Sequence, residues 1–145
     1  MIALMQRVTF AQVVVDGLEI AAIAHGVLAF IGVEQSDDYA AADKLLLRLL
    51  GYRIFADAAG KMNCSLQQTG GGLLLVPQFT LPADTKKGMR PSFTRAAAPA
   101  QGAKLYHYLL QQAEQQYHTV ASGRFAADMQ VTLCNDGPVT FWLQV

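Results

Sequence analysis

Apolar residues gather along this chain in short runs that turn-forming residues separate, a pattern typical of a strand-rich domain. Residues 27–33 and 73–76 are continuous apolar runs, as expected of strands that are buried on both faces. Asp16 and Gly17 predict a two-residue hairpin turn between apolar neighbours. The pattern as a whole predicts strands at residues 2–8, 11–15, 18–23, 27–33, 52–55, 73–76, 120–125, 129–134 and 139–145.

Two segments show the helical spacing of apolar residues instead. Ser36 or Asp37 is expected to cap a first helix that runs to Leu50, where Gly51 ends it. Pro99 precedes a second helix, residues 100–116. The side chains expected to face inward are Leu45, Leu46, Leu49 and Leu50 in the first helix, and Leu105, Tyr108, Leu109 and Ala113 in the second.

These elements predict an α/β fold of α+β character in a single domain, residues 1–145. Strand-rich mixed or antiparallel sheets are expected to form a barrel-like core with two main helices.

The hexapeptide Asn-Asp-Gly-Pro-Val-Thr at residues 135–140 stands out near the end of the chain. Asn135, Asp136 and Gly137 predict a hairpin turn between the last two strands. Pro138 lacks an N–H group, so it weakens the ladder that it opens. Two interpretations follow: an edge strand that tolerates proline at its first residue, or a backbone element that is presented for function.

Composition narrows the class of protein. Of the 145 residues, 52% are hydrophobic and 15% are charged, which is below the usual ~25% charged and favours self-association. Because no apolar run approaches 18–20 residues, we expect no membrane span. No secretory signal is recognisable. Cys64 and Cys134 lie far apart without metal-ligand spacing, and such thiols are typical of a cytoplasmic protein.

The net charge is zero, yet five basic residues and no acidic residue lie between residues 85 and 113: Lys86, Lys87, Arg90, Arg95 and Lys104. This cluster indicates either an anion or phosphate site or a solvated loop. The loop expected at residues 80–99 is long, and that length usually accompanies function or disorder.

The sequence contains no nucleophile elbow, no phosphate loop and no zinc motif. Gln78 and Thr80 follow directly on a buried strand, at the point where the long loop leaves, and a strand end of this kind is a favoured site. Cys64 is a second candidate nucleophile, but a semi-buried thiol without function explains it equally well.

Three segments together resemble one family, the bacterial D-aminoacyl-tRNA deacylases. They are Val-Pro-Gln-Phe-Thr-Leu at residues 76–81, Ala-Asp-Thr-Lys-Lys-Gly-Met-Arg-Pro-Ser-Phe at residues 83–93, and the hexapeptide at residues 135–140. The opening eight residues and Met62-Asn63 are similar to the family pattern as well.

The resemblance implies a homodimeric hydrolase that cleaves the ester of D-aminoacyl-tRNA and of mischarged glycyl-tRNA with help from the ribose 2′-hydroxyl. Gln78, Phe79 and Thr80 would form the catalytic pocket at the subunit interface. Gly137 and Pro138, as a cis dipeptide from the partner and held by Arg7, would reject L-amino acids. Lys86, Lys87 and Arg90 follow the pocket motif, so we expect them to meet tRNA phosphates. No metal, cofactor, membrane or DNA is implied.

Two positions depart from the family pattern. Pro77 stands where the family commonly has serine, and Ala126 stands where glycine is common. Two rival hypotheses therefore stay open: a non-catalytic RNA-binding dimer of the same fold, and an esterase of another acyl substrate that uses Thr80 or Cys64.

Overall fold

The structure is a computed structural model that describes residues 1–86 and 88–145. Its elements in chain order are β1 (Ile2–Val15), β2 (Leu18–Ile23), β3 (Gly26–Gly32), α1 (Tyr39–Gly51), β4 (Phe55–Ala56), β5 (Met62–Cys64), α2 (Leu66–Thr69), β6 (Gly72–Pro77), α3 (Pro99–Gln116), β7 (Val120–Ser122) and β8 (Gln130–Gln144).

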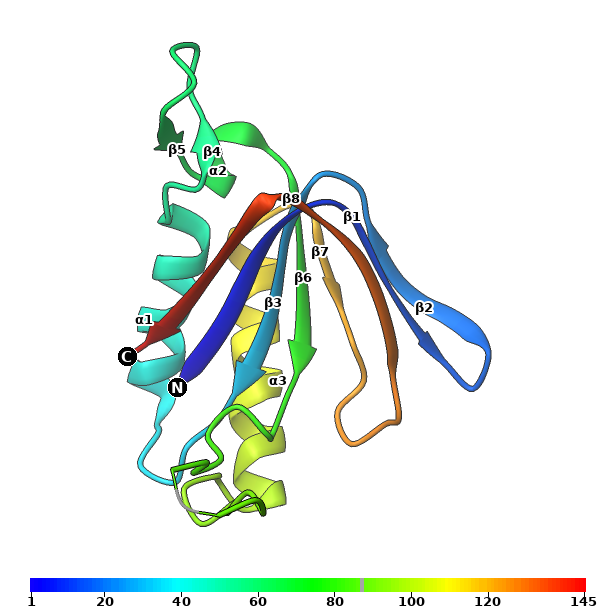
Figure 1. Ribbon diagram of the computed structural model, residues 1–145, viewed down its shortest axis with the longest axis vertical. Helices are drawn as coiled ribbons and strands as arrows, with labels where there is room; N and C mark the ends of the chain where they lie inside the picture. Colours follow the sequence, from blue (N-terminus) through cyan, green and yellow to red (C-terminus); the bar gives the residue numbers. More distant parts are fainter. Residues whose placement is uncertain (87) are drawn as a thin grey trace.

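A six-stranded mixed sheet organises the fold (Figure 1). Strand β1 pairs antiparallel with β8 along one edge, and with β3 and then β2 along the other. Strands β3, β6 and β7 are parallel neighbours. Because β2 comes back into contact with β6 and β7, the sheet is nearly closed and barrel-like. The α/β class with mixed sheets and two main helices is confirmed.

The sheet buries both of its faces, which explains the continuous apolar runs. Helices α1 and α3 lie side by side over one face (Figure 1). Alternate residues of the central strands point to them, including Val27, Ala29, Leu73 and Leu75. Leu28 and the other intervening residues enter a second core, between the central strands and the curled part of β1, β2 and β8.

The helices agree with the expected segments in most details. Asp38, one residue beyond the expected cap, accepts a hydrogen bond from Ala41 N at 2.9 Å and begins α1. All four leucines expected to face inward in α1 are buried. In α3, Leu105, Leu109 and Ala113 are buried as expected, and Tyr108 packs partly buried against the core while its hydroxyl donates to Asp43. Tyr106, which was not among the expected inward-facing residues, is buried as well.

The expected hairpin at residues 135–137 is wrong. The runs 129–134 and 139–145 belong to one strand, β8, which follows β1 almost from end to end. The turn residues form a bulge in it, because the pairing jumps from Val8↔Asn135 to Gln6↔Thr140 and leaves residues 136–139 opposite Arg7. Residues with a turn sequence in an edge strand can thus lose their hydrogen-bond pairing with the neighbouring strand without reversing the direction of the chain.

Other boundaries also differ from the sequence pattern. The runs 2–8 and 11–15 form one strand, β1, since Thr9 and Phe10 continue the extended backbone. The strand expected at 52–55 is the two-residue β4, which pairs with β5 in a separate small sheet. The strand expected at 120–125 is shortened to β7, and the short helix α2 lies in a segment for which the sequence pattern predicts neither a strand nor a helix. The hairpin turn at Asp16-Gly17 is confirmed, with φ of 53° and 77°.

Candidate active site

The segment after β6 folds tightly over the end of β3. Gln78 N donates to Ile31 O at 2.7 Å and continues the ladder by one residue, and Leu81 N then donates to Gln78 O at 3.3 Å to close a turn. A Cβ on Gly32 would lie 2.8 Å from Leu81 Cβ and 2.8 Å from Pro82 Cδ. Glycine at position 32 therefore permits the close approach that sets the position of residues 78–82.

Gln78, Phe79 and Thr80 expose polar groups at this turn. Gln78 Nε2 donates to Thr80 Oγ1 at 2.7 Å, which orients both side chains. The Phe79 ring is 65% exposed and its centroid lies 5.4 Å from that of Phe93 in the following loop. Within residues 1–86 and 88–145, neither the Phe79 N–H nor the Thr80 N–H donates to a protein acceptor. Two backbone donors are thus free to meet a ligand.

A cavity of about 790 Å³ opens beside this turn, a volume that suits a small-molecule or nucleoside site. Its walls come from the ends of β3 and β6, the beginning of α3, and residues 125–131. The lining is mainly apolar: Ile31, Val33, Val76, Pro77, Phe79, Phe93, Ala96, Ala97, Ala98, Pro99, Gly102, Tyr106, Phe125, Ala126, Ala127, Met129 and Val131, with Gln78 and Asp128 as polar members.

Both positions that depart from the family pattern line this cavity. Pro77 ends β6, where it pairs with Ile31. Ala126 has a φ of 60°, a left-handed conformation that glycine adopts more easily than alanine.

Tyr106 lies at the inner wall and is buried. Its hydroxyl donates to Leu75 O at 2.9 Å, and burial raises the pKa of this phenol. Tyr106 is therefore a neutral hydrogen-bonded wall residue and not a candidate base.

The bulge in β8 forms the second part of the expected site. Gly137 has a φ of +134° and its peptide bond to Pro138 is cis. Arg7 Nε donates to Asp136 O at 3.0 Å, and Arg7 Nη1 donates to Ile54 O at 2.7 Å. Inside the bulge, Val139 N donates to Asn135 Oδ1 at 2.7 Å. The sequence did not predict that the Asn135 side chain stabilises the bulge, although an asparagine side chain in a turn commonly forms a hydrogen bond with the nearby backbone.

The bulge and the turn at residues 78–80 lie at different levels of the sheet in one protomer. Pro77 pairs with Ile31, and Ile31 pairs in turn with Ala3 of β1, so Gln78, one residue further on, lies level with Ile2. The bulge lies level with Arg7. Five residues along a strand correspond to roughly 16 Å. The structure of one protomer does not bring the two expected parts of the site together.

The basic residues divide into two groups. Lys86 and Arg90 are exposed in the loop that follows the turn. Arg95 pairs with Glu34 at 2.8 Å, and Lys104 Nζ lies 5.3 Å from the centroid of the Tyr39 ring. Lys87 lies outside the described residues. The cluster of five basic residues in the sequence therefore overstates the positive charge that is free to bind an anion.

No helix in the described part of the chain is long and apolar enough to cross a membrane.

Comparisons with known proteins show the family of the chain. A model of the family described as D-Tyr-tRNA(Tyr) deacylase matches residues 4–144. A D-aminoacyl-tRNA deacylase of Pseudomonas putida is 62% identical over 142 residues, which are 98% of each chain. The protein of that name in Actinobacillus pleuropneumoniae serotype 5b is 59% identical over 145 residues, the full length of both chains.

Two solved structures share the fold. One, described as a c-Myc DNA Unwinding Element Binding Protein, has a TM-score of 0.96 and 35% identity over 100% of this chain and 99% of that one. The other, described as a probable eukaryotic D-amino acid tRNA deacylase, has a TM-score of 0.84 and 18% identity over 99% and 98% of the two chains. The second likeness, at such low identity, concerns the fold alone.

Fold and family match together define the class of protein, which is a hydrolase. The chain belongs to the D-Tyr-tRNA(Tyr) deacylase family.

Proposed function

We propose that this protein hydrolyses the ester between a D-amino acid and the terminal ribose of tRNA, in the cytoplasm and as a homodimer. Glycine mischarged onto tRNA would be a further substrate. The observation that carries the proposal is the pair of free N–H groups on Phe79, which lines the cavity, and on Thr80, the next residue, in a chain that belongs to this family.

The free donors suit an oxyanion site. Hydrolysis of an ester passes through a tetrahedral intermediate, and backbone N–H groups stabilise the negative oxygen that develops there. The aminoacyl ester is already activated, and the neighbouring ribose 2′-hydroxyl assists its hydrolysis. The protein then mainly holds the ester in place.

Thr80 serves as a positioning group in this mechanism. Its hydroxyl accepts a hydrogen bond from Gln78 Nε2. An amide cannot remove the hydroxyl proton, so Gln78 does not activate Thr80 as a nucleophile. Gln78 and Thr80 instead form one polar edge that orients the substrate.

Gly137 and Pro138 would supply the chirality filter from the partner subunit. Their carbonyl oxygens would occupy the space that the Cβ of an L-amino acid needs, and glycine would pass because it has no Cβ. The separation of roughly 16 Å along the strand supports insertion from a second copy, since the bulge of one protomer does not reach its own Gln78. Lys86, Lys87 and Arg90 would contact tRNA phosphates beside the pocket.

The direct test is incubation of the purified protein with D-Tyr-tRNA, L-Tyr-tRNA and Gly-tRNA. We expect release of D-tyrosine and glycine, with L-Tyr-tRNA left intact. No release from any substrate would indicate the non-catalytic RNA-binding dimer. Release of L-tyrosine at a similar rate would contradict the filter and favour a general esterase.

A mixing experiment tests the shared site. Gln78→Ala removes one half of the proposed site and Gly137→Ala the other, so each homodimer is expected to be inactive. Random exchange of subunits gives half heterodimers, each with one intact site, and therefore about a quarter of the wild-type sites. No recovery after mixing would contradict a site shared between subunits.

A further inference from the structure

Glu34 is a buried carboxylate that the proposed chemistry leaves unused. Only 8% of the residue is exposed, and it follows β3 at the end of a fully apolar run. A buried carboxylate is costly unless it is paired and hydrogen-bonded. Its partners therefore indicate what the residue holds in place.

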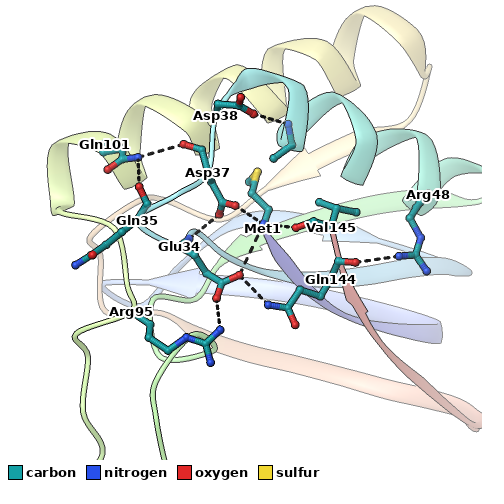
Figure 2. Close-up of polar contacts among 11 residues, drawn as sticks. Met1, Glu34, Gln35, Asp37, Asp38, Arg48, Arg95, Gln101, Gln144 and Val145 are labelled. Atoms are coloured by element: carbon teal, nitrogen blue, oxygen red, sulfur yellow. Dashed lines mark hydrogen bonds and ion pairs between the residues drawn. The ribbon is translucent and has the colours of Figure 1, made fainter.

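Figure 2 shows Glu34 at the centre of a polar network that joins four parts of the chain. Arg95 Nη2 donates to Glu34 Oε1 at 2.8 Å, and Gln144 Nε2 donates to Oε2 at 2.8 Å. The amino group of Met1 lies 3.9 Å from Oε2. Each carboxylate oxygen thus has its own donor, and the donor on Oε1 belongs to the loop that precedes α3.

The backbone beside the ion pair is tied down as well. Gln35 N donates to Arg95 O at 3.1 Å, and Ala97 N donates to Val33 O at 2.9 Å. Glu34 and Ala96 form an antiparallel bridge between these two bonds. Residues 33–35 and 95–97 therefore lie alongside each other, with the Glu34–Arg95 ion pair beside the backbone bonds.

This junction forms one wall of the cavity. Ala96, Ala97 and Ala98 line it with small side chains, of which Ala97 also packs against the core. Because side chains of this size fill little space, the position of the wall depends strongly on how the backbone is held. Two residues before Arg95, Phe93 lies against Phe79 of the candidate site. The Glu34–Arg95 ion pair is therefore connected to Phe79 through the short stretch of chain from Arg95 back to Phe93.

We propose that Glu34 and Arg95 are positioning residues whose ion pair fixes the cavity wall at residues 93–98 and, through Phe93, the Phe79 ring. The role in catalysis rests on the proposed function; the structural role does not. Arg95 acts on this wall and not on tRNA phosphate, in contrast to Lys86 and Arg90.

The test compares Arg95→Gln, Arg95→Lys, Glu34→Gln and the double variant Glu34→Gln/Arg95→Gln with the wild type. The Arg95 side chain is 55% exposed, so Arg95→Gln is expected to fold even if Glu34→Gln does not. Arg53→Gln, at an exposed position on the β4 side of the molecule, is the matched control for loss of one arginine.

The first readout is amide hydrogen exchange in peptides that cover residues 93–99 of the free protein. We expect Arg95→Gln and Glu34→Gln to speed exchange at residues 95–97 about tenfold, with no further increase in the double variant. Arg95→Lys should recover most of the protection. Emission of Trp142, the one tryptophan of the chain, should also shift because it lines a second hollow of about 370 Å³ with Arg95.

The second readout is steady-state deacylation of D-Tyr-tRNA. Loosening the wall should raise KM about tenfold and change kcat less, at low and high salt alike. Unchanged exchange in both single variants would overturn the proposal, as would a KM effect that vanishes at high salt, the sign of a lost phosphate contact. If the protein deacylates no substrate, the proposed function fails, while hydrogen exchange still decides whether the ion pair holds the wall.

Discussion

Arg7 and Asp136 are joined twice: Arg7 Nε donates to Asp136 O at 3.0 Å and lies 3.2 Å from its carboxylate Oδ2. The guanidinium also donates to Ile54 O, so one side chain ties the β8 bulge to the segment before β4. Planar guanidinium geometry allows all three contacts at once, and lysine cannot reproduce them.

Arg7→Ala should therefore disorder the bulge and lower D-Tyr-tRNA deacylation about 100-fold, the scale expected when a positioning group is lost. Arg7→Lys should recover only part of the rate. Arg53→Ala is the control for removing an arginine. Deacylation by Arg7→Ala within twofold of wild type would contradict the role of this contact.

Gly137→Ala should damage the site beyond its effect on stability. An added Cβ would lie 2.7 Å from Val139 Cγ2 and 3.0 Å from Arg7 Nη2, at a φ of +134°. Gly60→Ala is the matched control, because Gly60 also has positive φ (+75°) but nothing within 4 Å of the added carbon. Gly60→Ala should lose roughly 1 kcal/mol of unfolding free energy, and Gly137→Ala should lose more because of the close contacts, while only Gly137→Ala should lose deacylation by tenfold or more. Equal activities would show that the bulge is dispensable.

Lys86→Gln and Arg90→Gln should each weaken tRNA binding and reduce the salt slope. One phosphate contact contributes about 0.7–0.9 to the slope of log K against log salt concentration. Filter binding of uncharged tRNA across a salt series measures the change. Lys61→Gln, at an exposed turn far along the sequence, should leave the slope unaltered. A slope in Lys86→Gln and Arg90→Gln equal to that of wild type would argue against a tRNA contact here.

Ala126→Gly should stabilise the protein slightly. Ala126 has a φ of 60°, a conformation that is strained for alanine and not for glycine. The strain that glycine removes from the folded state exceeds the entropy that it adds to the unfolded chain by roughly 0.5–1 kcal/mol. Ala127→Gly, at a neighbour without positive φ, should destabilise instead. Urea unfolding of both variants measures the difference, and a loss of stability in Ala126→Gly would refute the explanation.

Tyr106 should make stability fall at high pH. Burial raises its pKa, so the folded protein keeps the phenol protonated after the unfolded chain begins to lose its proton near pH 10. The contribution of Tyr106 to the free energy of unfolding is thus fully present below about pH 10 and declines above that pH. Tyr106→Phe should flatten this decline between pH 9 and 11 in urea unfolding, because it removes the titrating group. Tyr117, whose pKa is raised by burial, and Tyr108, whose pKa is raised by its hydrogen bond to Asp43, contribute to the slope that remains.

Elements whose signal is local could be predicted from the residues alone. Continuous apolar runs are the ones buried on both faces, and the Leu45, Leu46, Leu49 and Leu50 stripe faces the core. Asp16-Gly17 also encodes its hairpin, because both residues tolerate the positive φ that the turn requires. The segment at residues 76–81 marked the position of the candidate site at the end of a buried strand.

Features that depend on a partner strand or on a distant charge became visible in the three-dimensional arrangement. Residues 135–137 carry a strong turn signal, yet pairing with the long β1 on both sides keeps the chain straight and converts the turn into a bulge. Arg95 belongs to a basic cluster in the sequence, yet its guanidinium pairs with the carboxylate of Glu34, 61 residues away in the chain. Local patterns favour a backbone conformation, whereas long-range pairing decides whether the chain reverses there and which groups are left free to act.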